Sequence, residues 1–346
     1  MIRAAKVRAG SYLNSFLKRY GLELIDSEVV YDWQRLSGPL AGPPQSESAV
    51  LPVDAASYLS PDNPRLVELR ERYKTFDSRV TTPIVWTDDY VRPQDILTFR
   101  GDNAYVWQRR GQNMHETAYA LTEFYIRSID ALGLLDKLSE DELFGVSTFV
   151  FDTKVVSRDL LDSILEMYFL ERHLGLFSRE KFNVLDIGAG YGRLAHRMTT
   201  AMLGLNAYLC TDGIAVSTFI CEYYLSFRGL SGRARAVPLD EVEDAIEAQP
   251  VDLAINVHSF SECTLVTIDW WLALLERRGV RYLMVVPNSG ELLSRDGKDF
   301  GMIIESHGYR LVAKDPKFGD PIVQNYAINP TYHYLFENQA APDPGI

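Results

Sequence analysis

The sequence predicts an α/β protein in which a mainly helical N-terminal unit precedes a largely parallel β-sheet. Short apolar runs alternate with helical stretches after Thr153, which is typical of parallel strands joined by helices. The last two runs have only a short loop between them, so we expect a terminal antiparallel hairpin. The predicted strands cover residues 183–187, 207–211, 235–237, 252–257, 282–286, 309–313 and 324–336.

Helical spacing in the N-terminal part is interrupted by proline and glycine. Apolar residues recur at helical intervals over 64–76 and 114–135, and residues 37–64 are typical of a long connection. Five basic residues among apolar ones over 1–24 predict an amphipathic helix, which packs on its own domain or a twin subunit, or attaches to a membrane surface. Ser157 is placed as the N-cap of a further helix that ends near Gly175.

The length of the chain indicates more than one unit. Its 346 residues exceed the roughly 250–300 residues at which a single core stops growing. We therefore expect a helical unit over 1–150, which covers a substrate or mediates homodimer formation, and a ligand-binding unit with the sheet over 151–346.

Composition and charge exclude several classes of protein. Hydrophobic residues make up 47% of the chain and charged ones 24%, as in ordinary globular domains. The net charge of −12 disfavours nucleic acid as a partner. Three cysteines without paired spacing suit a reducing compartment, and we see neither a membrane span nor a signal peptide. These features predict a cytoplasmic protein.

A glycine-rich turn is expected where the first strand of the sheet meets a helix. Residues 184–194 read Val-Leu-Asp-Ile-Gly-Ala-Gly-Tyr-Gly-Arg-Leu. Gly188, Gly190 and Gly192 have no Cβ, so the backbone can approach a ligand closely. Asp186 would repel a pyrophosphate but would attract the α-ammonium group of S-adenosylmethionine (SAM). The alternative interpretation is a tight turn that holds no ligand.

A second acid, Asp212, ends the next predicted strand. A carboxylate at this position can accept hydrogen bonds from both ribose hydroxyls of an adenosine. The alternative is an ordinary helix cap. Because strand, turn, helix and second acid follow one another in order, we favour a SAM site.

These features resemble class I SAM-dependent methyltransferases, whose Rossmann-like sheet has seven strands. Segments 156–162, 256–262 and 286–288 are similar to the bacterial sugar O-methyltransferase family, and in general kind to mycobacterial enzymes that methylate polysaccharide precursors. The resemblance extends over about residues 97–336. It implies methyl transfer to a sugar hydroxyl, with SAM lying over the C-terminal edge of the sheet. The expected cofactor contacts are Asp186, Gly188, Ala189, Gly190, Tyr191, Asp212, Gly213, Asn256 and Arg158.

Methyl transfer from a sulfonium to a hydroxyl needs alignment of the reacting atoms and a base for the hydroxyl proton. His258 follows the predicted strand 252–257 and is our first choice as the base. Glu262 lies four residues on and would orient the imidazole or bind a sugar hydroxyl if a helical turn begins here. Alternatively, His258 only ends the strand and Glu262 only interacts with a helix dipole.

The N-terminal unit offers further candidates. His115 and Tyr119 are expected to contact the substrate, and His115 and Glu116 provide an alternative base. The neighbouring side chains suited to sugar faces and hydroxyls are Trp107, Arg109, Arg110, Gln112 and Asn113. A divalent metal such as Mg²⁺ is compatible with this chemistry, but Asp240, Glu262 and Glu291 show no ligand spacing. We expect His333 on the terminal strand and outside the site.

Other interpretations remain open at this point. A dinucleotide-dependent dehydrogenase is disfavoured by the glycine spacing and by Asp186. A methyltransferase-like scaffold without catalysis is disfavoured by the presence of both acids. Other small-molecule hydroxyls, lipids and proteins remain possible acceptors, whereas no Asp/Asn-Pro-Pro-Tyr/Phe tetrapeptide of adenine N-methylation is present.

Overall fold

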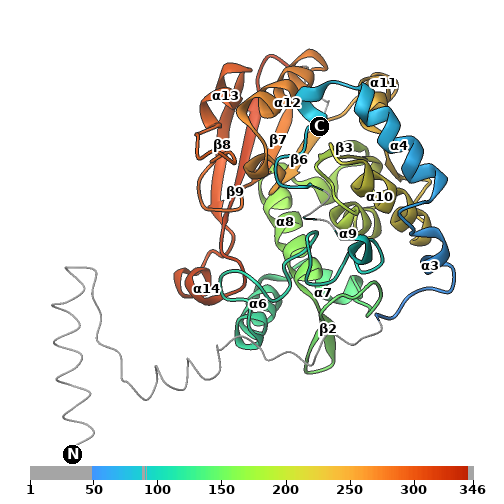
Figure 1. Cartoon of the computed structure of the whole chain (residues 1–346). Coiled ribbons are helices and arrows are strands. Elements are labelled where there is room, and N and C mark those ends of the chain that lie inside the picture. Colours follow the sequence, from blue (N-terminus) through green and yellow to red (C-terminus); the bar gives the residue numbers. More distant parts are fainter. Residues whose placement is uncertain (1–48, 88–89, 91, 342–346) are drawn as a thin grey trace, which may run out of the picture.

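The computed structural model describes residues 49–87, 90 and 92–341. The predicted helix over 1–24 and residues 37–48 of the predicted connection over 37–64 lie outside these residues. Figure 1 shows a central sheet with helices packed around it.

The large sheet has seven strands in the order β5-β4-β3-β6-β7-β9-β8. Its strands are β3 (Phe182–Ile187), β4 (Leu205–Thr211), β5 (Ala234–Ala236), β6 (Leu253–Val257), β7 (Tyr282–Val286), β8 (Tyr309–Pro316) and β9 (Tyr332–Asn338). All neighbours from β5 to β7 are parallel, whereas β9 runs antiparallel to both β7 and β8. The structure therefore confirms the predicted Rossmann-like seven-stranded sheet and its terminal antiparallel pair.

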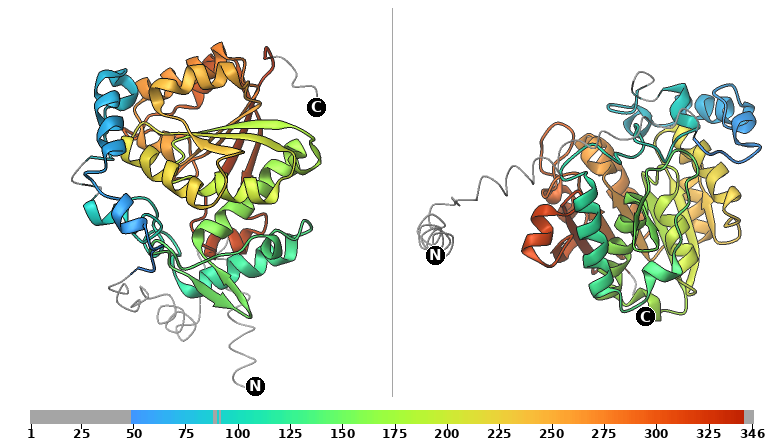
Figure 2. Two further views of the ribbon diagram at one scale, coloured as in Figure 1. Left: turned by 90° about the vertical axis from the view of Figure 1, so that its right-hand side faces the viewer. Right: turned by 90° about the horizontal axis from the view of Figure 1, so that it is seen from below.

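Helices cover both faces of this sheet, as two views at right angles show (Figure 2). They are α3 (Ala55–Tyr58), α4 (Pro64–Thr75), α5 (Ser78–Thr81), α6 (Glu116–Ile129), α7 (Leu134–Lys137), α8 (Arg158–Leu174), α9 (Arg193–Ala201), α10 (Ala215–Phe227), α11 (Val242–Ala248), α12 (Leu265–Arg277), α13 (Gly301–Ser306) and α14 (Pro321–Tyr326). Short 3₁₀ turns lie at Pro93–Ile96, Leu176–Ser178, Leu239–Glu241 and Ser259–Glu262. None of the helices in the described ranges has the length and apolar character needed to cross a bilayer.

The strands are apolar on both sides because each face of the sheet has its own core. Val184 belongs to the core that includes residues of α6, α8 and α9, whereas the next residue, Leu185, belongs to the core that includes residues of α4, α10, α11 and α12. This arrangement explains why the predicted parallel strands appear as continuous apolar runs.

Two predicted elements had wrong boundaries for identifiable reasons. The predicted strand over 324–336 is a strand only from Tyr332, because Asp320 accepts hydrogen bonds from the backbone of Ile322 and Val323 and starts α14. The predicted helix over 114–135 is divided because Gly133 is left-handed (φ 65°) and Asp130 caps α7. We also did not predict the small antiparallel hairpin of β1 (Phe149–Phe151) and β2 (Lys154–Val156).

The N-terminal helix α4 packs along α10 of the sheet-containing part (Figure 1). The hydroxyl of Tyr73 lies 2.9 Å from Thr218 Oγ1 and accepts a hydrogen bond from the backbone of Leu239. Arg65 forms an ion pair with Glu222. Residues on both sides of the predicted boundary at 150 and 151 therefore share one core, and this boundary falls inside β1. The division into two units stays a prediction.

Candidate active site

A cavity of about 630 Å³ opens at the C-terminal ends of β3, β4, β6 and β7. One wall consists of the glycine-rich turn after β3 and the first residues after β4. The opposite walls come from residues 257–263, from residues 288–290, and from residues 80–86 and 104–107 of the N-terminal part. Such an edge is where open α/β sheets bind their ligands.

The glycine-rich turn adopts a backbone that other residues rarely adopt. Gly188, Gly190 and Gly192 have φ angles of 73°, 56° and 87°. A Cβ on Gly188 would lie 2.2 Å from Ser259 Oγ, whereas a Cβ on Gly190 would meet nothing within 4 Å. The first glycine therefore permits close packing of the turn against the loop after β6, and the second leaves space beside the cavity.

Asp186 and Asp212 both line this cavity. Asp186 is buried and accepts a 2.8 Å hydrogen bond from the hydroxyl of Tyr208. Asp212 is half-buried, and its two oxygens accept hydrogen bonds from the backbone of Ile214 and Gly190 at 2.9 and 3.1 Å. Burial raises the pKa of each carboxyl group to about 7. Two acids that are expensive to ionise thus lie at one end of the cavity.

His258 and Glu262 line the cavity but do not form the predicted dyad. His258 has a left-handed backbone (φ 69°), and its Nδ1 has no hydrogen-bond partner among the described residues. Burial, followed by the nearby Arg158, lowers the pKa of His258 to about 3. Glu262 instead accepts a 2.6 Å hydrogen bond from Trp86 Nε1, and burial raises its pKa above the usual value. Glu262 therefore has Trp86 as its partner, and no hydrogen bond joins it to His258 among the described residues.

The other predicted cofactor residues divide into two groups. Ala189, Tyr191, Gly213 and Arg158 line the cavity. Asn256 is fully buried and is not one of the lining residues; its side chain donates to Ile187 O and accepts from the backbone of Phe260. Asn256 thus ties the loop after β6 to the end of β3, and the geometry gives it no ligand contact.

The predicted substrate residues His115 and Tyr119 do not line the cavity. His115 is buried and caps α6 by accepting a hydrogen bond from the backbone of Ala118. Tyr119 is fully buried and donates to the backbone carbonyl of Gln108. The prediction that His115 and Tyr119 contact the substrate was therefore wrong, because both side chains stabilise α6 instead. Their neighbours Trp107, Arg110 and Gln112 do line the cavity, whereas Arg109 and Asn113 do not.

Trp86 is the main lining residue that sequence reasoning missed. It donates its indole hydrogen to Glu262 and contacts the rings of Tyr90 and Tyr105, with centroid distances of 5.8 and 5.2 Å. The tryptophan lies in an irregular stretch that shows no periodicity. Its aromatic character, in a stretch between Pro83 and Pro93, was the only available indication that it forms part of a cavity wall.

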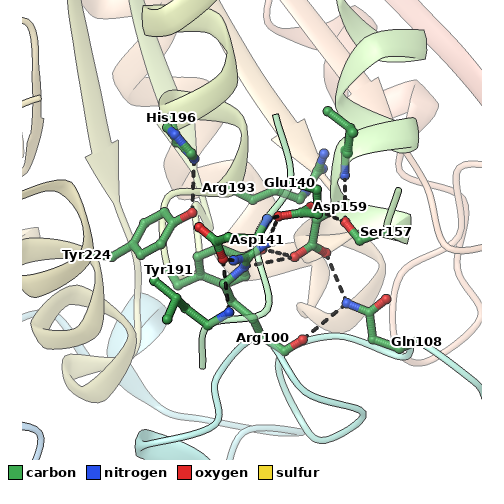
Figure 3. A network of polar contacts seen from close by, with 12 residues as sticks. Arg100, Gln108, Glu140, Asp141, Ser157, Asp159, Tyr191, Arg193, His196 and Tyr224 are labelled. Atoms are coloured by element: carbon green, nitrogen blue, oxygen red, sulfur yellow. Dashed lines mark hydrogen bonds and ion pairs between the residues drawn. The ribbon is translucent and has the colours of Figure 1, made fainter. Parts of the chain in front are cut away.

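A buried polar network supports the turn from below (Figure 3). Tyr191 donates its hydroxyl hydrogen to Asp159, which also lies 3.5 Å from Arg100 Nε. Arg100 is completely buried and pairs with Glu140, which in turn pairs with Arg197 of α9. Asp159 lines the cavity, but its two oxygens accept hydrogen bonds from Tyr191 and Gln108, which indicates a structural role within this network.

A metal site finds no support in this cavity. Within the described part of the chain, no group of three or more His, Cys, Asp or Glu side chains is arranged to hold a metal ion. Asp240 pairs with Arg72 on the surface, and Glu291 does not line the cavity. His333 lies on β9, as predicted.

The comparisons with known proteins are weak in sequence. No family model matches the chain, and no curated protein matches it either. Among solved structures, TrmK from M. capricolum with bound S-adenosyl-homocysteine has a TM-score of 0.35 and 11% identity, over 52% of this chain and 70% of TrmK. Magnesium protoporphyrin IX methyltransferase from Synechocystis has a TM-score of 0.35 and 12% identity, over 51% and 79%. The cyclase SpnF has a TM-score of 0.39 and 12% identity, over 66% and 99%. Similarity at this level assigns no function.

Proposed function

We propose that this chain is a SAM-dependent methyltransferase that transfers a methyl group to a hydroxyl of a sugar. The observation that carries the proposal is the meeting of Asp186, Asp212 and the glycine-rich turn in one cavity at the C-terminal edge of the sheet. The class I methyltransferase sheet provides this edge, and the cavity of about 630 Å³ is in the size range of small-molecule sites.

The residues present fit a SAM molecule better than a dinucleotide. Asp186 has a hydroxyl as its hydrogen-bond partner, so the α-ammonium group of the donor would supply the missing positive charge. Each oxygen of Asp212 accepts one hydrogen bond from the backbone. Because a carboxylate oxygen can accept more than one hydrogen bond, Asp212 can still bind two ribose hydroxyls. Two acids would repel a pyrophosphate, which disfavours the dehydrogenase alternative.

The donor supplies an electrophilic methyl group on a positively charged sulfur. The chain has to hold the donor, bring the hydroxyl oxygen into line and accept the hydroxyl proton. The loop after β6 carries the two residues that are available for the proton.

We assign the role of general base, which accepts the hydroxyl proton, to Glu262 instead of His258. An imidazole with a pKa of about 3 is neutral but binds a proton weakly, and burial together with the positive charge of Arg158 causes this low pKa. Glu262 has a raised pKa, because its surroundings disfavour the ionised form, and its carboxylate is held in one orientation by Trp86. A general base works best when its pKa approaches the working pH, and Glu262 satisfies this condition better. His258 then contributes a neutral, unpaired nitrogen beside the donor.

The walls around Glu262 suit an uncharged ring. Trp86, Tyr90, Trp107 and Trp271 bring four aromatic side chains to the cavity, and the apolar faces of sugars pack on such rings. The acids nearby disfavour an anionic acceptor. Another small-molecule hydroxyl is the alternative acceptor, and a scaffold without catalysis is the alternative function.

Two experiments test this proposal. Calorimetry should show binding of S-adenosylhomocysteine (SAH) and no binding of NAD; absence of SAH binding would contradict the SAM site. Methyl transfer from labelled SAM should then be measured on neutral oligosaccharides, with simple phenols as the comparison. If only the phenols become labelled, the acceptor belongs to another class of hydroxyl compound. If no product becomes labelled, the alternative of a scaffold without catalysis is favoured.

A homodimer and a cytoplasmic location remain predictions. Light scattering after size-exclusion chromatography tests the first. Fractionation of cells that express the full chain tests the second.

A further inference from the structure

Lys317 is a buried lysine that the proposed chemistry does not use. It follows β8, and only 2% of its side-chain surface is exposed. Its Nζ lies 2.6 Å from Asp162 Oδ1 and donates to the backbone carbonyls of Ile328 and Asn329 at 3.0 and 3.3 Å. All three ammonium hydrogens thus have acceptors, which is the arrangement that a buried charge requires.

Asp162 connects this lysine to the cavity. Its second oxygen, Oδ2, accepts a 3.1 Å hydrogen bond from Arg158 Nε. Burial opposes ionisation of Asp162, but Lys317 and then Arg158 outweigh burial and hold the pKa of Asp162 below its usual range. The carboxylate therefore stays charged and fixes one edge of the Arg158 guanidinium.

Arg158 is fixed on a second side as well. Its Nη1 donates a 2.7 Å hydrogen bond to the backbone carbonyl of Trp107. Within residues 49–87, 90 and 92–341, its Nη2 has no hydrogen-bond partner. Because Arg158 lines the cavity, an immobilised guanidinium with an unused nitrogen is available to a ligand there.

The other cations that line the cavity are already engaged. Both terminal nitrogens of Arg193 bind Glu166, and one also contacts Ser163. Arg110 is half exposed, pairs with Asp102 and lies over the ring of Trp107. Among the described lining residues, Arg158 is therefore best placed to bind an anionic group in the cavity.

We propose that Lys317 and Asp162 are positioning residues that hold Arg158 for the α-carboxylate of an amino-acid zwitterion, whose α-ammonium group binds Asp186. This inference rests on the proposed function, since the donor carries such a zwitterion at one end. It extends that function because it assigns the carboxylate contact and two residues that act on the ligand through Arg158. Charge-assisted hydrogen bonds between guanidinium and carboxylate are among the strongest in proteins, so their geometry controls affinity.

The test compares two ligands that differ in the amino-acid end. SAH carries the zwitterion, and 5′-methylthioadenosine has the same nucleoside without it. Calorimetry on the full chain should show that Lys317→Met weakens SAH binding about 10- to 100-fold and leaves the affinity for 5′-methylthioadenosine within about twofold. Asp162→Asn and Arg158→Met should show the same selective loss of SAH binding. Lys317→Arg keeps a positive charge and should therefore bind SAH more tightly than Lys317→Met does.

A matched control separates positioning from general loss of stability. Arg281→Met removes a half-buried ion pair with Glu337 at the start of β7, away from the cavity. It should lower the melting temperature without changing the ratio of the two affinities. If Lys317→Met does not fold, the affinities of Asp162→Asn and Lys317→Arg for SAH and 5′-methylthioadenosine are compared instead.

The outcomes distinguish the inference from the function on which it rests. Equal loss of both ligands in the variants, or no loss of either, would overturn the positioning role while leaving the SAM site intact. If the unaltered chain binds neither ligand, the proposed function fails and the inference fails with it.

Discussion

The two sides of the cavity are built in different ways. The donor side, which we define as the glycine-rich turn with Asp186 and Asp212, is formed by consecutive strand ends within 27 residues of sequence. The acceptor side, which we define as Trp86, Tyr90 and Glu262, combines segments that are far apart in the chain, and the bond from Trp86 to Glu262 spans 176 positions. The donor side therefore depends on local backbone geometry, and the acceptor side depends on how the N-terminal part packs.

This difference suggests that substitutions on one side should leave the function of the other largely unchanged. Variants of the acceptor side should change turnover but not SAH affinity. Variants of the donor side should change SAH affinity first. The link between the two sides is electrostatic, since the Glu262 carboxylate contributes to raising the pKa of Asp212.

The largest effect should follow removal of the proposed base. Glu262→Gln keeps the shape and the acceptor oxygen for Trp86 but cannot accept the proton, so turnover should fall by roughly 10²–10⁴-fold. SAH affinity should change by less than about threefold. Steady-state rates with labelled SAM, together with calorimetry, measure both quantities.

His258→Ala is the comparison for this variant. Its turnover should fall less than that of Glu262→Gln, because the imidazole holds a proton weakly. A larger loss for His258→Ala would return the role of base to His258.

On the donor side, Asp212→Ala removes the acceptor for two backbone groups and for the ribose. SAH affinity should fall about 100-fold, which corresponds to the loss of hydrogen bonds to a charged group. Asp240→Ala is the control, because this acid follows the neighbouring strand β5 but pairs with Arg72 on the surface. Unchanged SAH affinity in Asp212→Ala would remove the ribose contact from the model of the site.

The glycines of the donor side allow a matched pair of substitutions. Gly188→Ala adds a Cβ 2.2 Å from Ser259 Oγ on a left-handed backbone, so the free energy of unfolding should fall by about 2–3 kcal/mol. Gly190→Ala meets no neighbour and should cost about 1 kcal/mol, mainly from its positive φ angle. Urea denaturation measures both values. Equal losses would show that contact with Ser259 does not limit residue 188, and Ser259→Gly should restore part of the Gly188→Ala loss.

The smallest effect should be the pH dependence of SAH binding, which follows from the two acids of the donor side. In the folded chain without SAH, Asp186 and Asp212 ionise near pH 7, whereas the unfolded groups ionise near pH 4. Stability from these raised pKa values is present below about pH 4 and is lost as the pH rises towards 7.

A bound α-ammonium group favours ionised Asp186, so SAH affinity should rise several-fold from pH 6 to pH 8. Melting temperatures with and without SAH across this range measure the effect. Asp186→Asn should abolish most of the pH dependence, and a flat profile in the unaltered chain would contradict the ammonium contact.

The same contrast explains how far the sequence was informative. Apolar runs and three glycines were enough to predict the sheet, its terminal hairpin and the donor side, because these features are local. The sequence could not show that the side chain of Asn256 is hydrogen-bonded to the backbone of Ile187 and Phe260, or that His115 caps a helix. Both features depend on tertiary packing. Trp86 was missed since no periodic pattern points from residue 86 to residue 262.

The packing of α4 on α10 has a consequence for how the chain is made. Glu222 is synthesised 157 residues after its partner Arg65, and Glu262 is synthesised 176 residues after its partner Trp86. At about 5–20 residues per second, the latter delay is on the order of 10–35 s at the ribosome. Apolar residues of α4 remain without their partners during this interval, so a chaperone that covers them would raise the yield. The pocket is completed late in translation, and only chains that have reached that stage can gain protection from a bound nucleoside.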